Sequence, residues 1–415
     1  MSGERLKIAM VFPPMLHGGR DLDLANWRTA ARGTTGSEVQ CLATSLELAK
    51  RGHEVTLFMV NPSHTRFEGL KVLPYQTLFV EGFVGDQNGT HGMRRQSDNY
   101  DVVAATLDVN LHRRLSTRPL RVTFQQVNDF AYGEPGFAEF VDVFISPSKP
   151  HRDMMTGARA QTGGWWTSKE KWEVVGNGCY PDEYPAKRTV MGFEETVERV
   201  PGRVMYASSP DRGLHWLLMA WPRIKQEVPH AELRIFYYAL SNFLQWADRD
   251  EAGLDPKWQD YARRAKYIKR ALPALEGLGV KYCGSVSRAQ MAVELSEAEV
   301  YAYPCDVVDW TEGFSCATLE GCASGAIPVI SDVDALGEIY EGGCPMVSPP
   351  MKESFDAWVS SVIFVLQHPE AQASWRERGR ALAARYSWPN IAAQVEDIFY
   401  RRLLEKKSAA SQETR

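Results

Sequence analysis

Short apolar runs alternate with amphipathic stretches along the first half of the chain. Residues 6–12 and 54–60 have the length and composition expected of strands buried on both faces of a parallel sheet. Between them, residues 37–50 place apolar side chains at helical spacing, with Ser37 as the expected cap and Gly52 at the end. A strand–loop–helix–strand unit of this kind predicts a parallel sheet with right-handed crossovers. Further strands are expected at residues 102–106, 121–125 and 143–146.

The alternation stops at residues 186–202, which have no clear periodicity, and then restarts. The second set of strands is expected at residues 203–207, 232–238, 280–283, 300–304 and 327–331. We therefore predict an α/β protein with two parallel-sheet domains, residues 1–190 and 203–389, joined by a linker at residues 191–202. A last helix, at about residues 390–410, is expected to pack back on the first domain.

Composition and charge exclude several classes of protein. The chain has 415 residues, 44% of them apolar, and a net charge of −5. These values fit a globular protein of two or three domains and disfavour a general nucleic-acid binder. No apolar stretch is long enough to span a membrane, and residues 1–11 lack the pattern of a signal peptide. Because the seven cysteines are scattered and form no zinc pattern, we expect a reduced, cytoplasmic protein.

Residues 301–338 carry the strongest chemical signal. A strand is followed by a helix that is expected to begin near residues 313–315 and to end at Gly325. The free N–H groups and the positive dipole end of such a helix bind phosphate well. Glu320 lies eight residues after Glu312, about 12 Å along the axis if the residues between them are helical. That separation is too long for a paired acid and base or a shared metal ion, but it suits the two ends of one extended ligand.

The pattern Glu312-x7-Glu320, followed by Gly325 and an apolar strand, resembles the signature of the large group-1 (family 4-like) retaining glycosyltransferases. The resemblance implies a GT-B fold, in which two Rossmann-like parallel-sheet domains face each other across a cleft. It implies that Glu312 contacts hydroxyls of the donor sugar and that Glu320 accepts hydrogen bonds from the ribose of the nucleotide. It also implies that the diphosphate meets backbone N–H groups at the head of the helix, from Phe314, Ser315, Cys316 and Ala317.

Other segments match the family at intervals over most of the chain. Gly36, in the first loop and helix, allows the backbone to approach the diphosphate closely. Gly284 ends the strand that lies beside the base in the family. The remaining matches are residues 52–55, the Asn177-Gly178 turn and Ser387-Trp388.

Residues 208–214 are expected to bind the diphosphate. Arg212-Gly213 stands where the family has Lys-Gly, so the resemblance makes Arg212 the cation for the leaving diphosphate. A guanidinium can hold two phosphate oxygens at once. The second cation of the family falls near Ala207 and is missing here. Ser208, Ser209 or a group of the first domain is therefore expected to supply another donor.

Residues 121–129 end an expected strand of the first domain, at the edge that should face the cleft. Gln125, Gln126 and Asn128 are candidates for binding acceptor hydroxyls, since amide side chains both donate and accept but cannot act as a base. Asp129 is a candidate for orienting the acceptor hydroxyl or relaying its proton, and a purely structural loop carboxylate is the alternative. The choice of acceptor is expected to depend on loops at residues 14–35 and 64–100.

We interpret the sequence as a glycosyltransferase that moves a sugar from a nucleotide-diphosphate sugar to an acceptor hydroxyl, with the retention of configuration that the resemblance implies. The helix N-terminus and Arg212 take the place of a metal ion, so no cofactor is expected. The expected partners are the nucleotide-sugar donor and an acceptor that is a small molecule, a glycan or a lipid-linked molecule, and no nucleic acid. The alternatives are a non-catalytic nucleotide-sugar-binding protein and a GT-B sugar phosphorylase or epimerase.

A nicotinamide-dependent oxidoreductase is disfavoured, because the first loop has no GxGxxG run and Asn61, after the second strand, is not acidic.

Residues 240–278 form a long connection with an apolar helical face and nearby basic residues. This segment either covers the edge of the second sheet or makes a peripheral contact with a membrane surface or an acceptor.

Overall fold

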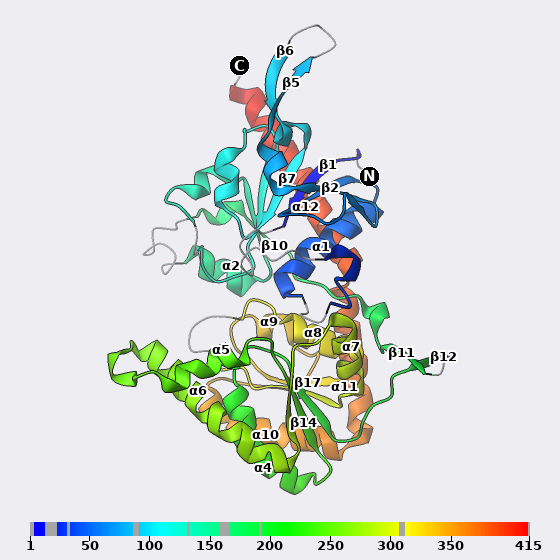
Figure 1. The fold of residues 1–415 in the computed structure, drawn as a ribbon, viewed down its shortest axis with the longest axis vertical. Helices are drawn as coiled ribbons and strands as arrows, with labels where there is room; N and C mark the ends of the chain where they lie inside the picture. The colour runs from blue at the N-terminus through cyan, green and yellow to red at the C-terminus, as the bar shows by residue number, and fades with distance from the viewer. Residues whose placement is uncertain are drawn as a thin grey trace. The chain divides into compact units, whose positions relative to one another are not determined.

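The computed structural model describes residues 4–12, 23–30, 34–85, 91–130, 133–157, 167–190, 193–306 and 312–413. The chain forms two compact units (Figure 1). Unit 1 contains Met1–Trp27, Thr35–Asn177 and Trp388–Arg415, and unit 2 contains Arg28–Thr34 and Gly178–Ser387. Each unit has its own largely parallel sheet, as the alternation of strands and helices predicted.

The sheet of unit 1 consists of β1 (Lys7–Val11), β2 (Glu54–Met59), β3 (Arg66–Phe67), β4 (Leu70–Pro74), β7 (Val102–Thr106), β8 (Leu120–Phe124), β9 (Val143–Ser146) and β10 (Trp172–Val174). These eight strands lie in the order β10-β9-β8-β7-β1-β2-β4-β3, and all neighbours are parallel except β3 and β4. In the centre, Ile8 pairs with Val55 on one side and Val102 on the other. All three residues are buried, as expected of strands that helices cover on both faces.

The helices of unit 1 include α1 (Gly36–Lys50), α2 (Lys149–Thr156) and α12 (Trp388–Glu413). A separate antiparallel hairpin contains β5 (Glu81–Gly85) and β6 (His91–Arg95), and short 3-10 helices lie at Leu24–Asn26, Tyr75–Phe79, Gln96–Asn99, Asn110–Arg114, Phe137–Phe140 and Lys169–Lys171. The N-cap of α1 is Thr35, not the expected Ser37. Thr35 N donates to Glu38 Oε2 at 2.7 Å while Glu38 N donates to Thr35 Oγ1 at 3.4 Å. This reciprocal capping box satisfies two N–H groups, which a single serine cap does not.

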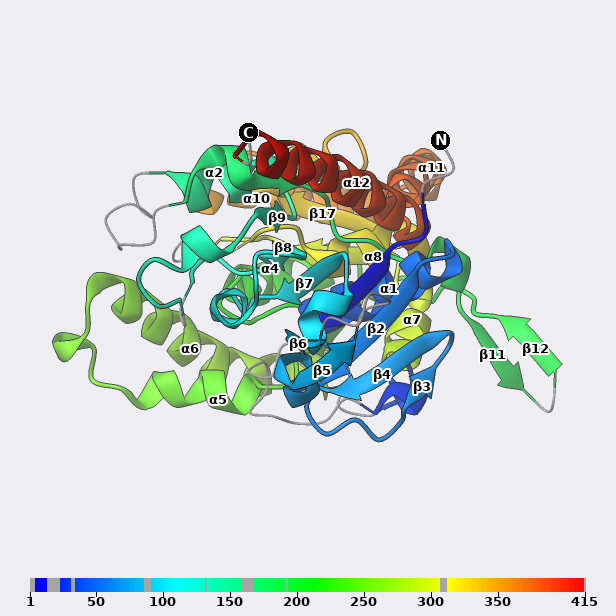
Figure 2. The ribbon, with the colours of Figure 1, turned by 90° about the horizontal axis from the view of Figure 1, so that it is seen from above.

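The last helix of the chain, α12, belongs to unit 1 although the preceding part of that unit ends at Asn177. Within unit 1 it packs against α1 and β8 (Figure 2). Glu396 of α12 lies 2.7 Å from His53 Nε2 and accepts a hydrogen bond from Arg51 Nε at 2.9 Å. Further along the helix, Arg402 Nε donates to Glu173 Oε1 at 2.8 Å. These contacts tie α12 to both the α1–β2 corner and the β10 edge.

The sheet of unit 2 consists of β13 (Arg203–Tyr206), β14 (Glu232–Phe236), β15 (Val280–Gly284), β16 (Val300–Tyr303), β17 (Ile327–Ser331) and β18 (Met346–Val347). The six strands are parallel and lie in the order β15-β14-β13-β16-β17-β18. The first strand in the sequence, β13, is therefore central, and the order of the strands reverses between β13 and β16. In open parallel sheets, ligands bind outside the carboxyl ends of the strands at such a reversal.

The helices of unit 2 are α4 (Leu214–Glu227), α5 (Leu240–Leu244), α6 (Pro256–Leu275), α7 (Arg288–Glu297), α8 (Cys316–Ser324), α9 (Leu336–Tyr340), α10 (Met351–Gln367) and α11 (Pro369–Arg385), among the described residues. The segment expected to link the two halves contains an antiparallel hairpin of β11 (Lys187–Val190) and β12 (Phe193–Thr196).

The long connection at residues 240–278 packs on unit 2 through α6. Ala265 and Ile268 of α6 belong to the core of the unit. At the start of the helix, Trp258 stacks on Trp246, with ring centroids 5.0 Å apart. The structure thus agrees with the covering role for this segment that the sequence offered as one of two possibilities.

Two further properties concern the chain as a whole. None of the described helices is both long and apolar enough to cross a membrane. All seven cysteines are free thiols. Burial raises the pKa of Cys41 and Cys344 to about 12, so these two thiols stay protonated at neutral pH.

Candidate functional site

Two loops meet at the carboxyl edge of the unit 2 sheet. One follows β13 and leads into α4, and it contains Ser208 and Arg212. The other follows β16, and its described part begins at Glu312 and leads into α8. Because β13 and β16 are neighbours in the sheet, the loops that follow them lie side by side at the reversal of strand order.

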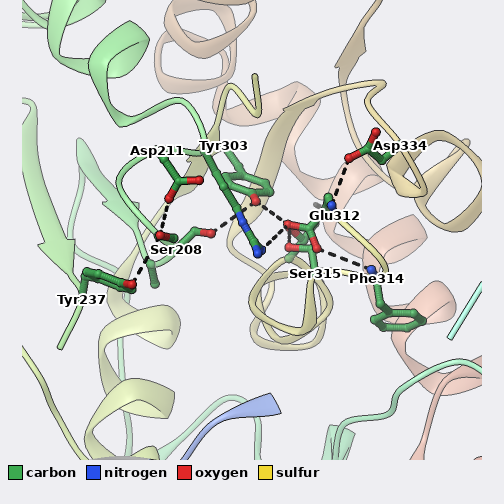
Figure 3. Close-up of polar contacts among 12 residues, drawn as sticks. Ser208, Asp211, Tyr237, Tyr303, Glu312, Phe314, Ser315 and Asp334 are labelled. Carbon is green, nitrogen blue, oxygen red and sulfur yellow. Dashed lines mark hydrogen bonds and ion pairs between the residues drawn. The ribbon is translucent and has the colours of Figure 1, made fainter. Parts of the chain in front are cut away.

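Glu312 is the centre of the contacts between these loops (Figure 3). Arg212 Nη1 donates to Glu312 Oε2 at 3.1 Å, and the Tyr303 hydroxyl donates to the same oxygen at 2.5 Å. The other oxygen, Oε1, receives a long contact of 3.4 Å from Phe314 N. The backbone of Glu312 is also held, since its N–H donates to Asp334 Oδ2 at 3.0 Å. With 4% of its surface exposed, this glutamate is a fixed, buried carboxylate and not a solvated surface group.

Arg212 is held in its charged form. Burial alone would lower its pKa, but the Glu312 carboxylate outweighs that effect and raises the pKa well above the ordinary value of arginine. Gly213, which follows, has a φ of 98°, and a Cβ added there would lie 1.8 Å from the carbonyl oxygen of Pro304. The Arg-Gly pair therefore reflects a close approach of the β13–α4 loop to the end of β16, for which only glycine is suited.

The β13–α4 loop is supported from within and from α6. Ser208 Oγ donates to the Tyr303 hydroxyl at 3.2 Å, and Ser209 Oγ contacts both Asp211 and the hydroxyl of Tyr237. The buried Arg264 of α6 donates from Nη1 to the carbonyl oxygen of Asp211 at 2.8 Å. The long connection at residues 240–278 therefore helps to fix the loop that carries Arg212, a role that no sequence motif indicated.

The head of α8 has the features of an anion-binding helix terminus. Ser315 occupies the left-handed region, with a φ of 64°, and its side chain makes no capping hydrogen bond to the helix. Its Oγ instead lies 2.7 Å from Thr318 Oγ1. A non-glycine residue in this conformation is strained, and such strain gathers at functional sites. The first turn of a helix is the part whose N–H groups favour an anionic ligand.

Glu320 lies within α8 and forms an ion pair with Arg288 of α7. Arg288 Nη2 donates to Glu320 Oε1 at 2.8 Å, and the two side chains are 15% and 11% exposed. Burial lowers the pKa of Arg288, but the carboxylate of Glu320 more than offsets this effect, so the pKa of Arg288 lies above its ordinary value. Because α8 begins only at Cys316, Glu312 precedes the helix by a loop, and the helical estimate of the Glu312–Glu320 separation does not apply.

Gly284 ends β15 at the same edge of the unit 2 sheet, with a φ of 74°. Its carbonyl oxygen accepts a hydrogen bond from Tyr237 N at 3.1 Å, and the Tyr282 hydroxyl donates to the carbonyl of Tyr237 at 2.7 Å. The structure therefore gathers Ser208, Ser209, Arg212, Gly284, Phe314, Ser315, Cys316, Ala317, Glu312 and Glu320 in unit 2, all on or beside the carboxyl edge of one sheet.

The residues expected to bind the acceptor lie in unit 1, after β8. Gln125 is buried, and its Nε2 donates to the carbonyl oxygens of Val127 and Asp129 at 2.9 and 2.7 Å. Asn177 Nδ2 donates to Gln126 Oε1 at 2.8 Å. Among the described residues, Gln125 Oε1 and Asn177 Oδ1 are buried with no hydrogen-bond donor. Two acceptor oxygens at one sheet edge thus remain for donors that a ligand can supply.

The other predicted residues of unit 1 lie on the surface of the same loop or at a helix start. Asn128 is half-buried, Asp129 is exposed, and Gly36 is the first residue of α1. The predicted loop at residues 14–35 lies partly outside the described residues, and residues 307–311 of the β16–α8 connection also lie outside them.

His151, in α2, lies next to the loop that follows β8, and no sequence pattern marked it as a candidate. It is fully buried, with Nε2 3.1 Å from the carbonyl oxygen of Val127 and Nδ1 2.7 Å from Ser146 Oγ. Burial lowers its pKa to about 4, so the ring is neutral at pH 7. It supports the backbone of the loop between Gln125 and Asp129.

Among the described residues, no group of three or more His, Cys, Asp or Glu side chains is arranged to hold a metal ion.

The part of unit 2 that contains this site matches a known protein family. Residues 200–368 match the family model described as glycosyl transferases, group 1, and this match supports a group-1 glycosyltransferase. The matched residues contain the loop with Arg212, the head of α8 and both glutamates. No curated protein matches the chain.

Solved structures resemble the whole chain. A sucrose-phosphate synthase from Thermosynechococcus elongatus has a TM-score of 0.62 at 16% identity, over 97% of this chain and 100% of that one. HepE from Anabaena, solved with UDP and glucose, has a TM-score of 0.60 at 15% identity, over 96% and 100%. A glycosyltransferase from Rickettsia africae has a TM-score of 0.62 at 11% identity, over 97% and 99%. At these identities the likeness concerns the fold, and it shows that the chain has the expected GT-B fold.

Proposed function

We propose that the protein is a retaining glycosyltransferase that moves a sugar from a nucleotide-diphosphate sugar to an acceptor hydroxyl. The donor binds to unit 2. Glu320, oriented by Arg288, accepts from the ribose hydroxyls; the head of α8 and Arg212 bind the diphosphate; and Glu312 accepts from hydroxyls of the sugar. The family match over residues 200–368 supports the reaction class.

The observation that carries this proposal is the 3.1 Å contact between Arg212 and Glu312 beside the head of α8. A cation and a helix N-terminus favour phosphate, while a carboxylate favours hydroxyl groups. Groups that favour phosphate and a group that favours hydroxyls therefore lie together at this sheet edge. A sugar diphosphate is the kind of ligand that presents a phosphate and a hydroxyl-bearing ring within one bond of each other.

In the proposed reaction, the bond between the anomeric carbon and the diphosphate oxygen breaks, and its electron pair leaves with the diphosphate. The acceptor oxygen forms the new bond on the same face of the sugar, and the acceptor proton passes to the departing diphosphate. Arg212 and the helix terminus stabilise the charge that develops on the leaving group, so no metal ion is required. Asp129 orients the acceptor hydroxyl.

The acceptor binds to unit 1 through Gln125, Gln126 and Asn128. The oxygens Gln125 Oε1 and Asn177 Oδ1, which have no donor among the described residues, favour an acceptor that brings its own hydroxyl donors. We further propose that the protein acts in the cytoplasm, where its seven free thiols stay reduced.

The experiment that tests the proposal is a thermal-shift screen with nucleotide sugars, followed by a release assay. UDP-glucose is the first donor to try, because a solved structure of Anabaena HepE holds it, and GDP-, ADP- and TDP-sugars complete the panel. We expect a shift with one donor, release of its nucleoside diphosphate on addition of a hydroxyl acceptor, and a product whose anomeric configuration by NMR equals that of the donor.

Each alternative gives a different result. Binding without release in the presence of sugar and glycan acceptors indicates a non-catalytic binder. Consumption of inorganic phosphate with formation of a sugar phosphate indicates a phosphorylase, and a change in the sugar without an acceptor indicates an epimerase. An inverted product contradicts retention alone, whereas no shift with any member of the panel contradicts the whole proposal.

A further inference from the structure

Tyr303 is a fully buried residue at the end of β16 that contacts the central carboxylate of the site. Its ring lies among the rings of Tyr206 and Tyr301, with centroid distances of 6.1 and 5.9 Å. Burial raises the pKa of Tyr303 well above its ordinary value, so its hydroxyl is a permanent donor at neutral pH. A buried hydroxyl needs partners, and those partners determine what it does.

The Tyr303 hydroxyl joins the β13–α4 loop to Glu312 (Figure 3). It accepts a hydrogen bond from Ser208 Oγ at 3.2 Å and donates its own proton to Glu312 Oε2 at 2.5 Å. A hydroxyl that accepts one hydrogen bond donates a stronger one, because the bonds polarise each other. The chain from Ser208 through Tyr303 to Glu312 is therefore directional and ends on one oxygen of the carboxylate.

The two oxygens of Glu312 are unequally occupied. Oε2 receives both Tyr303 and Arg212, whereas Oε1 receives, among the described residues, only the 3.4 Å contact from Phe314 N. A carboxylate oxygen can accept two hydrogen bonds. Oε2 is thus filled by the protein, and Oε1 is the oxygen with capacity for a ligand hydroxyl.

We propose that Tyr303 is a positioning residue that holds Glu312 with Oε1 presented to the donor sugar. The inference rests on the proposed function for the identity of the ligand. Tyr303 does not touch the sugar itself. It acts through Glu312, by fixing the rotation of the carboxylate and by keeping Arg212 from drawing both oxygens towards itself.

Tyr301 provides a matched control. It lies two residues before Tyr303 on the same strand, is equally buried, and donates its hydroxyl hydrogen to the carbonyl oxygen of Ala207 at 3.2 Å. Tyr301→Phe removes a buried hydroxyl of the same kind from the same strand, but its partner is not Glu312. The pair of variants separates the loss of a buried hydrogen bond from the loss of the contact with the carboxylate.

The experiment compares wild type, Tyr303→Phe and Tyr301→Phe with UDP-glucose, or with whichever donor of the panel gives the larger thermal shift. We expect kcat/KM for the donor to fall at least about tenfold in Tyr303→Phe, the loss that removal of a charge-assisted hydrogen bond produces. The affinity for the free nucleoside diphosphate should change less than about twofold in both variants, and Tyr301→Phe should keep wild-type turnover. Equal kcat/KM in Tyr303→Phe and Tyr301→Phe would overturn the inference.

Two further measurements keep the test independent of folding and of the proposed activity. Crystal structures of both variants report the orientation of Glu312 directly, and we expect the carboxylate to rotate in Tyr303→Phe only. If wild type transfers no sugar, the proposed function fails, but the orientation of Glu312 in these crystals still decides the role of Tyr303. Should Tyr303→Phe not fold, a crystal structure of Ser208→Ala, which weakens the same chain of hydrogen bonds, reports the orientation of Glu312, and an unrotated carboxylate then counts against the inference.

Discussion

Arg288 of α7 and Glu320 of α8 form an ion pair, with Arg288 Nη2 2.8 Å from Glu320 Oε1. The pair is largely buried, so neither side chain can be changed without leaving the other charge without its partner. A ligand that binds Glu320 meets a carboxylate whose orientation is already fixed by a cation. Because the side chain is already ordered, binding of a ligand costs less conformational entropy.

Glu320→Gln is expected to weaken binding of the nucleoside diphosphate by about 1.5–3 kcal/mol, because the proposed charge-assisted hydrogen bond from the ribose would be lost. Isothermal titration calorimetry measures the change. Glu294→Gln is the matched control, since Glu294 is also a buried glutamate of unit 2 in an ion pair, with Arg234 Nε 2.9 Å from its Oε2. Undiminished affinity in Glu320→Gln would remove this residue from the ribose site.

Arg212→Ala is expected to lower the catalytic rate about 10²-fold or more, as the loss of an electrostatic donor to a transition state does. Arg212→Lys should recover part of the rate, because a lysine supplies the charge without the bidentate geometry. Arg263→Ala, at an exposed arginine of α6, controls for the loss of a positive charge. Near wild-type turnover in a folded Arg212→Ala variant would mean that another group holds the diphosphate.

Gly213→Ala is expected to destabilise unit 2 by at least about 2 kcal/mol, from the clash with Pro304 and the strained backbone together. The φ of 98° and the 1.8 Å approach to the carbonyl oxygen of Pro304 are the reasons. Gly253→Ala is the control, because an added Cβ there meets nothing within 4 Å. Denaturant unfolding compares the two variants, and equal midpoints would show that the loop accommodates a side chain.

Acid is expected to destabilise unit 1 through His151. Burial lowers the pKa of this histidine from 6.5 to about 4, so between these pH values the unfolded chain binds a proton that the folded chain does not. Stability therefore falls as the pH drops from 6.5 to 4, by on the order of 3 kcal/mol. His151→Gln should flatten this part of the profile of unfolding midpoint against pH.

His64→Gln, at a histidine that is partly exposed, controls for the loss of an imidazole in the pH experiment. His112, whose pKa burial lowers to about 3, contributes with the same sign and is present in every variant compared. A profile for His151→Gln that runs parallel to that of wild type would contradict the prediction.

Activity is expected to survive an excess of EDTA, because in the proposed mechanism Arg212 and the head of α8 stabilise the leaving diphosphate without a metal ion. The release assay with and without chelator measures this. A loss of activity that Mg²⁺ or Mn²⁺ restores would contradict the metal-free mechanism.

The local features of the sequence predicted most of the fold. Periodicity placed most strands of the two sheets within a few residues, because a strand buried on both faces must be continuously apolar. These strands are β1, β2, β7, β8, β9 and β13 to β17. Strands β3, β4, β10 and β18, at or near the sheet edges, and the two hairpins were not among the expected strands. Gly325 predicted the end of α8, and it adopts the left-handed conformation that ends helices, with a φ of 79°. The predicted N-cap of α1 was wrong by two residues. Serine and threonine are both good N-caps, and only the reciprocal contact with Glu38 favours Thr35 over Ser37.

The partners of the candidate residues could not be predicted in the same way. Arg212 and Glu312 are 100 positions apart in the sequence, and Arg288 and Glu320 are 32 apart. Spacing along the chain says which residues share a helix face, but it does not say which loops meet at a sheet edge. For this reason the roles of Tyr303, Arg264 and His151 were not predicted. Arg264 and His151 contact backbone carbonyls, and Tyr303 meets Glu312 from the other end of a loop.

The membership of α12 in unit 1 has a consequence for the synthesis of the protein. Apart from Arg28–Thr34, unit 2 is continuous from Gly178 to Ser387, whereas unit 1 is complete only when Trp388–Arg415 has been made. Until then Glu173 and His53 lack their partners on α12. On the ribosome, where chains emerge from the N-terminus, the domain that begins first is finished last, and a truncation that spares every residue of unit 2 still leaves unit 1 unfinished.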